Sequence, residues 1–341
     1  MGGGSEIEQV EPMSELMDKR NSPQPNITVP DFPNVVNVEV YRGNCPCRCV
    51  HCPVGTAPPA QRKQIFGAGE ISLSLFRKIA EEISTHSTPV LRIHSTGEPL
   101  LWQKLPNAMD ILKKTRTKSW LFTSAVTTDK SLLAAICEAV RIIEVSVNSI
   151  SAEDYRSTKG IDAFALVMEN IRYMRGVIGQ EKSRRLIVSR VESGRGDVDN
   201  EFVSYWKSSN LVDDAFIRSR HTYNGLLPEL MQGPPLVAKK EPCLVHWARF
   251  NIGLGGQAIV CFNELFKNNI DRSLILGDVN IELIAEIWKG AKLAALRRAE
   301  LTGDYSELTY EDVLPCKNCT SCQPLFGSER KTSEYQLGQV E

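Results

Sequence analysis

The sequence lacks the features that mark membrane and secreted proteins. No apolar run approaches the roughly 18 residues that a membrane-spanning helix needs. The opening stretch MGGGSEIEQVEPMSE is acidic and glycine-rich and has no apolar core, unlike a secretory signal peptide. Both absences predict a soluble, cytoplasmic protein.

A charge excess of either sign is absent as well. The 341 residues include 40 Lys and Arg against 41 Asp and Glu, for a formal charge of −1. This balance argues against a strongly basic nucleic-acid-binding protein, and we expect no nucleic-acid partner. No repeat occurs at solenoid periods. The length suits about two domains and a large core that needs no disulfides.

Cysteine, in contrast, is abundant, with ten residues in the chain. In a cytoplasmic protein, such usage indicates metal or redox chemistry before disulfides. Cys137 stands alone in the helical pattern SLLAAICEAV, and we predict a buried core thiol there. The others fall into a first set (Cys45, Cys47, Cys49, Cys52), a pair (Cys243, Cys261) and a last set (Cys316, Cys319, Cys322).

Residues 35–220 alternate about six times between strand and helix patterns. The predicted strands are 35–41, 89–94, 120–124, 142–149, 185–191 and 215–219, and the predicted helices are 72–84, 105–114, 132–140, 164–177 and 202–208. Such alternation predicts parallel β/α units with right-handed crossovers. Six units are fewer than the eight of a closed barrel, so the pattern alone allows a partial barrel or an open doubly wound sheet.

Composition divides the chain into three segments. Residues 1–34 are polar and proline-rich and read as an irregular lead-in. Residues 35–225 form the predicted α/β domain. Residues 226–341 begin with a proline-rich linker, continue with five cysteines, and contain a predicted strand at 258–262 and a long predicted helix at about 281–300.

Cys45, Cys49 and Cys52 have the spacing C-x3-C-x2-C directly after the first predicted strand. Loops at the carboxyl ends of parallel strands are where α/β folds place active sites. Thiolates are typical ligands of iron–sulfur clusters, and three cysteines leave one iron of a 4Fe–4S cluster open to a substrate or cofactor. The alternatives are a zinc knuckle with Cys47 as a fourth ligand, or a set of redox thiols; otherwise we interpret Cys47 as lying outside the ligand set.

This loop resembles the radical S-adenosylmethionine (SAM) superfamily, and the resemblance covers about residues 35–220. The segment Thr96-Gly97-Glu98-Pro99 is similar to the family's GGEP motif, which holds the amino group of SAM, with Thr96 replacing the first glycine. The segment VSVNS at 145–149 resembles the S-x-D-G element. There Ser146 matches, and Asn148 replaces the acid.

The resemblance implies an α/β fold with a partial (β/α)6 barrel of the radical SAM type. It implies SAM as cofactor and a 4Fe–4S cluster bound by Cys45, Cys49 and Cys52. It also implies a flavodoxin or ferredoxin-type electron donor as partner. His51 would lie near the adenine, or be a plain loop residue, and Ser189 and Arg190 would bind the methionine carboxylate. The implied SAM-binding residues are Thr96, Gly97, Glu98, Ser146, Ser189, Arg190 and His51.

The C-terminal cysteines resemble the SPASM/twitch extension of radical SAM enzymes. The resemblance includes Gly256 before Cys261, the turn Leu276-Gly277-Asp278, Trp288, and CKNCTSC. A full SPASM domain has seven cysteines, so the five here imply one auxiliary 4Fe–4S cluster in a small cluster-binding domain. The implied ligands are Cys243, Cys261, Cys316 and Cys319, with Cys322 as an alternative fourth ligand or a free thiol. A zinc site is the alternative, because four thiolates suit zinc equally well.

The resemblance implies an enzyme that generates a 5′-deoxyadenosyl radical and abstracts hydrogen from a small-molecule substrate such as an aminocyclitol, sugar or nucleoside sugar. We expect oxidation of an alcohol with the auxiliary cluster as electron acceptor. The alternatives are a redox-neutral epimerase or decarboxylase with Cys322 as hydrogen donor, a ribosomal-peptide maturase, and a non-enzymatic electron carrier or zinc module. The short segment before the first strand argues against a peptide-binding domain. Candidate substrate-binding residues, each with a surface role as the alternative, are Glu192, Arg218, Arg220, His221 and Tyr223.

Overall fold

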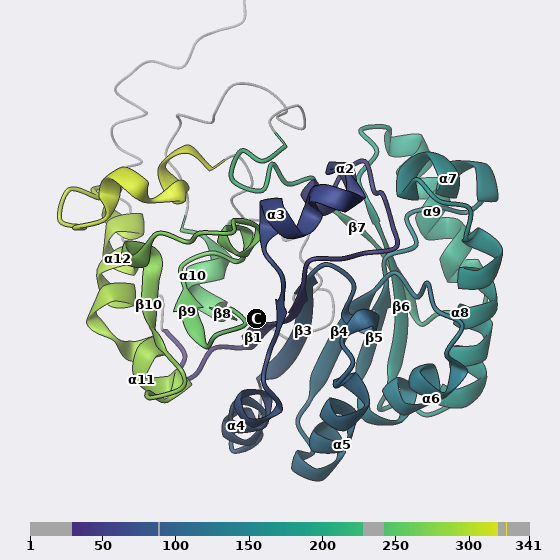
Figure 1. The fold of residues 1–341 in the computed structure, drawn as a ribbon, viewed down its shortest axis with the longest axis horizontal. Helices are drawn as coiled ribbons and strands as arrows, with labels where there is room; N and C mark the ends of the chain where they lie inside the picture. The colour runs from purple at the N-terminus through teal and green to yellow at the C-terminus, as the bar shows by residue number, and fades with distance from the viewer. Residues whose placement is uncertain (1–28, 88, 228–241, 320–324, 326–341) are drawn as a thin grey trace, which may run out of the picture.

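The structure, a computed structural model, describes residues 29–87, 89–227, 242–319 and 325. Its framework is a single mixed sheet that is flanked by helices (Figure 1). Six of the strands are parallel and lie side by side in chain order. They are β1 (Val35–Arg42), β3 (Val90–Thr96), β4 (Ser119–Thr123), β5 (Ile142–Val145), β6 (Arg185–Val191) and β7 (Asp214–Arg218).

Helices connect these strands and cover the outer face of the sheet (Figure 1). They are α4 (Leu73–Ser84), α5 (Leu105–Thr115), α6 (Lys130–Ala139), α7 (Ala152–Lys159), α8 (Phe164–Ile178) and α9 (Gly196–Ser208). Among the described residues, β7 pairs with β6 and with no strand at the far end of the sheet, so the barrel is open. This confirms the predicted partial (β/α)6 barrel and decides against the flat doubly wound alternative.

Alternation along each strand produces two different faces. In β1, Val36, Val38 and Val40 are fully buried in the main core together with apolar side chains of the helices. Asn37, between them, lines the inner cavity instead. The floor of the inner face is a second apolar cluster of Val90, Trp120, Ile142, Ile187 and Phe216. The barrel is therefore filled at its base and polar toward the carboxyl ends of its strands.

The predicted start of a helix matches the structure where a side chain caps the first turn. Ser72 caps α4, which matches the helix predicted at 72–84, and its hydroxyl accepts a hydrogen bond from the Leu75 amide at 3.1 Å. The single helix predicted at 281–300 is wrong: α11 (Ile284–Lys289) and α12 (Ala291–Thr302) are separate, because the backbone is extended at Gly290. No helix in the described ranges is both long and apolar enough to cross a bilayer.

The C-terminal segment continues the sheet of the barrel. Its strands are β8 (Arg249–Ile252), β9 (Gln257–Ile259) and β10 (Ile275–Asp278), and α10 (Leu244–Ala248) precedes them. Strand β8 pairs in parallel with β1, with Val35 opposite Arg249. At this seam the Asn37 amide nitrogen donates to the Asn251 side-chain oxygen at 2.8 Å. The strand predicted at 258–262 is β9, and most of the predicted linker lies outside the described residues.

Candidate active site

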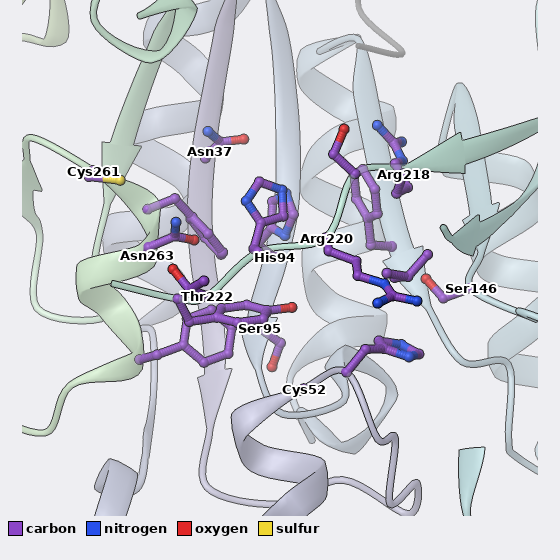
Figure 2. A pocket seen from close by; sticks show the side chains of 18 of the residues that line it. Asn37, Cys52, His94, Ser95, Ser146, Arg218, Arg220, Thr222, Cys261 and Asn263 are labelled. Carbon is purple, nitrogen blue, oxygen red and sulfur yellow. The ribbon is translucent and has the colours of Figure 1, made fainter. Parts of the chain in front are cut away.

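One cavity of about 740 Å³ lies where the carboxyl ends of the parallel strands face the C-terminal segment. Figure 2 shows Cys52 and Cys261 at its rim, with His94 and Arg220 among the side chains around it. The cysteines that line it are Cys45, Cys47, Cys49 and Cys52 from the loop after β1, and Cys243, Cys261, Cys316 and Cys319 from the C-terminal segment. Two sets far apart in the sequence therefore belong to one site.

Backbone contacts shape the loop that carries the first cysteine set. The buried Arg62 guanidinium, at the start of α3 (Arg62–Phe66), donates to the Cys45 carbonyl at 2.6 Å and to the Cys47 carbonyl at 3.1 Å. Gly55 in α2 (Pro53–Thr56) passes so close that a Cβ there would lie 2.3 Å from the Cys49 carbonyl oxygen. The frame around the thiols is thus tightly packed, as a ligand set requires.

Burial favours the thiol form of these cysteines in the polypeptide. It raises the pKa of Cys52 to about 11. The pKa of Cys49 also rises to about 11, first through its contact with the Cys47 thiol and then through burial. The buried cation of Lys159 opposes both shifts. Because clusters bind thiolates, assembly would release these protons, and three soft donors beside a buried cation fit an anionic cluster.

A mononuclear metal site has different requirements. Within the described ranges, no three His, Cys, Asp or Glu side chains converge closely enough to hold one metal ion. A cluster takes its thiolates at wider spacing, because each iron accepts one of them.

The turn after β3 contacts the cysteine loop through its backbone. The Glu98 amide donates to the Asn44 carbonyl at 2.9 Å, and a Cβ at Gly97 would lie 2.3 Å from the same oxygen. The buried Glu98 carboxylate accepts hydrogen bonds from the Thr123 hydroxyl, the Ser124 amide and hydroxyl, and the Leu100 amide. Glycine is needed at position 97 for this close approach, and Glu98 joins the turn to the end of β4.

The ends of β5 and β6 are joined by Asn148, the residue that replaces the family's acid. Its backbone is left-handed, with φ of 61°, a conformation that Asn adopts more readily than most residues. Its side-chain oxygen accepts from the Val191 amide at 2.7 Å, and its backbone amide donates to the Ser189 carbonyl at 3.0 Å. Asn148 thereby fixes Ser146 and Ser189 at neighbouring strand ends.

Most of the predicted SAM-binding residues meet at the cavity. Those that line it are Gly97, Glu98, Ser146, Ser189 and His51. Two do not line it. The Thr96 hydroxyl donates to Glu39, and the Arg190 guanidinium binds the Asn148 carbonyl and the Asp154 carboxylate. Arg190 therefore supports the end of β5 from outside the cavity, and the SAM-binding roles of the whole set stay predictions.

The second cysteine set is tied together by a buried carboxylate. Glu300 of α12 accepts hydrogen bonds from His246 Nδ1 at 2.7 Å, the Trp247 indole at 2.9 Å and the Cys243 amide at 3.3 Å. His246 Nε2 lies 3.9 Å from Cys316 Sγ. Although burial opposes it, the carboxylate holds the pKa of His246 well above its usual value. Cys322 lies outside the described residues.

Between the two cysteine sets, the cavity is polar. All five candidate substrate residues line it: Glu192, Arg218, Arg220, His221 and Tyr223. Arg218 is paired with Glu144, and the Arg220 amide donates to the Glu192 carboxylate. Burial, reinforced by the charges of Arg249 and Arg218, lowers the pKa of His221 to about 4, so its ring is neutral at pH 7.

Sequence reasoning missed several residues of this site. Arg62, Lys159 and Glu300 are close in space to the cysteines, but no spacing along the chain connects them to either set. Arg92 and His94 could have been found. They are two positions apart in a predicted strand, so they share one face of the sheet, and both line the cavity.

Comparisons with known proteins agree with this geometry. Residues 243–323 match the SPASM family, an iron–sulfur cluster-binding domain. No curated protein matches the sequence. Among solved structures, BtrN in complex with AdoMet and 2-DOIA is similar, with a TM-score of 0.54 and 15% identity, covering 88% of this chain and 98% of BtrN.

Two further structures are similar over most of the chain. SuiB from Streptococcus suis, bound to the precursor peptide SuiA, has a TM-score of 0.59 and 12% identity, covering 87% of this chain and 75% of SuiB. The protein anSMEcpe, with bound AdoMet and Cp18Cys peptide, has a TM-score of 0.57 and 12% identity. The match covers 89% of this chain and 94% of the anSMEcpe chain. With its matching C-terminal segment, this chain has the fold of the radical SAM enzymes that carry a SPASM-type iron–sulfur domain.

Proposed function

We propose that the protein is a radical SAM enzyme that oxidises an alcohol of a small polar substrate. The observation that carries this proposal is the shared cavity, in which two cysteine sets, the Gly97-Glu98 turn and a polar lumen face one another. An aminocyclitol, sugar or nucleoside sugar would offer hydroxyl and amino groups to the polar side chains that line that lumen. The likeness to BtrN, whose structure holds AdoMet and 2-DOIA, supports a small substrate.

The residues that would hold the cofactors are those that the resemblance to radical SAM and SPASM enzymes implies, and they line the cavity. Cys45, Cys49 and Cys52 would bind a 4Fe–4S cluster, and Cys243, Cys261, Cys316 and Cys319 an auxiliary one. SAM would lie over the Gly97-Glu98 turn and the ends of β5 and β6. When bound to the first cluster and reduced by one electron, SAM supplies the 5′-deoxyadenosyl radical that abstracts a substrate hydrogen.

The chain's own residues bind and orient the substrate. The Arg218–Glu144 pair, Asn37 and His94 present donors and acceptors suited to hydroxyl and amino groups. Phe122 stacks on His94 with 4.5 Å between ring centroids and forms an apolar wall. His221 is neutral, and its Nδ1 is buried without a hydrogen-bond partner among the described residues, so it can accept a hydrogen bond from a substrate hydroxyl.

The proposed alcohol oxidation must account for every electron and proton that leaves the substrate. Oxidation of an alcohol to a carbonyl removes two electrons and two protons from the substrate. One electron and one proton leave as the abstracted hydrogen atom. The second proton would pass from the hydroxyl to solvent, and the centre held by the C-terminal cysteines would take the second electron. An external flavodoxin or ferredoxin-type donor would supply the electron that starts each cycle.

Anaerobic turnover tests the proposal. Reconstituted protein is incubated in deuterated water with SAM, dithionite, and separate panels of aminocyclitols, sugars, nucleoside sugars and peptides. We expect 5′-deoxyadenosine and a product that has lost two hydrogens, with no carbon-bound deuterium at the reacting carbon. Absence of 5′-deoxyadenosine with every panel would argue against a radical SAM enzyme.

Two alternatives remain for the same site. A redox-neutral epimerase or decarboxylase would put solvent deuterium on carbon, and Cys322→Ala would then stop turnover while 5′-deoxyadenosine still forms. Peptide maturation is favoured by the likeness to SuiB bound to SuiA and to anSMEcpe bound to a peptide. It would show as a mass change in the peptide panel alone.

A further inference from the structure

Lys159 is a buried cation that the proposed chemistry does not use. It is the last residue of α7, only 3% of its surface is exposed, and it lines the same cavity as the cysteines. Its ammonium donates a hydrogen bond to the Ser146 carbonyl at 2.7 Å, at the end of β5. The side chain therefore lies between the first cysteine loop and the strand ends where SAM would bind.

The end of α7 is built against the cysteine loop. The Arg48 amide donates to the Lys159 carbonyl at 2.8 Å, and the Val50 amide donates to the Thr158 carbonyl at 3.1 Å. Gly160, which follows, has φ of 67°, and a Cβ there would lie 2.7 Å from the Arg48 carbonyl oxygen. These contacts hold the end of α7 against the backbone of the cysteine loop.

An ammonium buried in this way needs a counter-charge. Burying an unpaired ion costs several kcal/mol, so buried lysines are normally paired. Among the described residues, no carboxylate lies within ion-pair distance of Lys159. The ionisable groups that interact most strongly with its charge are Cys45, Cys47 and Cys49 of the loop and Tyr155 of its own helix. Lys159 lines one cavity with these cysteines and its helix contacts their loop, so an anionic cluster bound there would supply the counter-charge.

We propose that Lys159 is a positioning residue whose charge stabilises the reduced cluster on Cys45, Cys49 and Cys52 and so raises its reduction potential. This inference rests on the proposed function. Reduction adds one electron from the external donor, makes the centre more negative by one charge, and breaks no bond. A fixed cation in a buried setting stabilises the more negative state more than the less negative one.

Redox titration of the reconstituted protein tests the inference. The relevant cluster is the one whose electron paramagnetic resonance spectrum changes when SAM is added. Lys159→Met and Lys159→Gln should lower its midpoint potential by at least the equivalent of a tenfold change in the one-electron equilibrium, about 59 mV. Lys159→Arg keeps the charge and should leave the potential near that of the unmodified protein.

Lys130 provides the matched control. Its ammonium also donates a hydrogen bond, to the Asn170 side-chain oxygen at 2.6 Å, but it pairs with Glu169, belongs to α6 and does not line the cavity. Lys130→Met should leave the potential unchanged. An unchanged potential in both neutral Lys159 variants, with the SAM-dependent spectrum intact, would overturn the inference and leave the proposed function standing.

Loss of the cluster is also informative. If both neutral variants lose the iron of this loop while Lys159→Arg keeps it, the charge is needed for assembly, which supports the inference. If Lys159→Arg loses it too, the residue acts through packing and the inference is wrong. If the unmodified protein binds no iron at this loop, the proposed function itself fails.

Discussion

At the residue scale, Glu98 and Ser189 test where SAM lies. Neither is a proposed iron ligand, and both line the cavity. Glu98→Ala and Ser189→Ala should each weaken SAM binding about 10- to 100-fold, because losing one charge-assisted hydrogen bond costs about 1.5–3 kcal/mol. Equilibrium binding of SAM to the anaerobic protein, with iron counted in parallel, measures this. Unchanged affinity in both variants, at full iron content, would show that the cofactor lies elsewhere.

Cys137 makes a second prediction at this scale, and it concerns pH. Burial raises the pKa of its thiol to about 12, and its sulfur faces the Met174 carbonyl at 3.9 Å. Only the thiolate reacts with alkylating agents, and at pH 8 about one molecule in 10,000 carries it. We expect iodoacetamide to leave Cys137 unlabelled in the folded protein at pH 8, by peptide mass, and to label it in urea. Rapid labelling of the folded chain would contradict this burial.

At the element scale, two glycines distinguish the effect of packing α7 on the cysteine loop from the effect of ending a helix. Gly160 and Gly303 both end helices in the left-handed conformation, but a Cβ at Gly303 meets nothing within 4 Å. Alanine at either position costs about 1 kcal/mol for the backbone. Gly160→Ala should in addition push the Arg48 region away and reduce iron bound by the loop. Equal iron content in the two variants would show that α7 does not shape the loop.

The same scale shows what a sequence pattern can and cannot predict. The barrel was predictable because each strand alternates and Ser72 and the Gly97-Glu98 turn carry local signals. Helix α7 was missed, since its mostly polar segment AEDYRSTK has too few apolar residues for a 3.6-residue period. Gly290 ended a helix that apolar periodicity alone would continue.

Some residues of the candidate site were likewise predictable from the sequence, and others were not. The cysteine ligands and the SAM turn are contiguous motifs, so spacing reveals them. Arg62, Lys159, His246 and Glu300 act through contacts between distant segments, which no local pattern records. Arg190 was expected to bind the methionine carboxylate because it ends the fifth predicted strand together with Ser189. Adjacent strand residues point to opposite faces, however, and Arg190 pairs with Asp154 instead.

At the scale of the whole molecule, the two cysteine sets predict two 4Fe–4S clusters. Anaerobic reconstitution should give about eight irons per chain, four for each cluster. A triple Cys45/Cys49/Cys52→Ala variant should keep about half of this iron and lose SAM cleavage. Iron and zinc are counted together, because stoichiometric zinc with only four irons would rule out the auxiliary cluster.

The pairing of β8 with β1 also has a consequence for folding during synthesis on the ribosome. The Asn37–Asn251 contact joins residues 214 positions apart, and at 5–20 residues per second the ribosome needs roughly 10 to 40 s to make the intervening segment. During that interval the edge of β1 at Val35–Val38 that later meets β8 has no neighbour, and an open edge invites pairing with other nascent chains. Slower synthesis at low temperature lengthens the interval between the synthesis of β1 and that of β8. Chaperones that cover the edge of β1 would prevent it from pairing with other chains. Yield in a heterologous host should therefore depend on what shields β1 until β8 emerges.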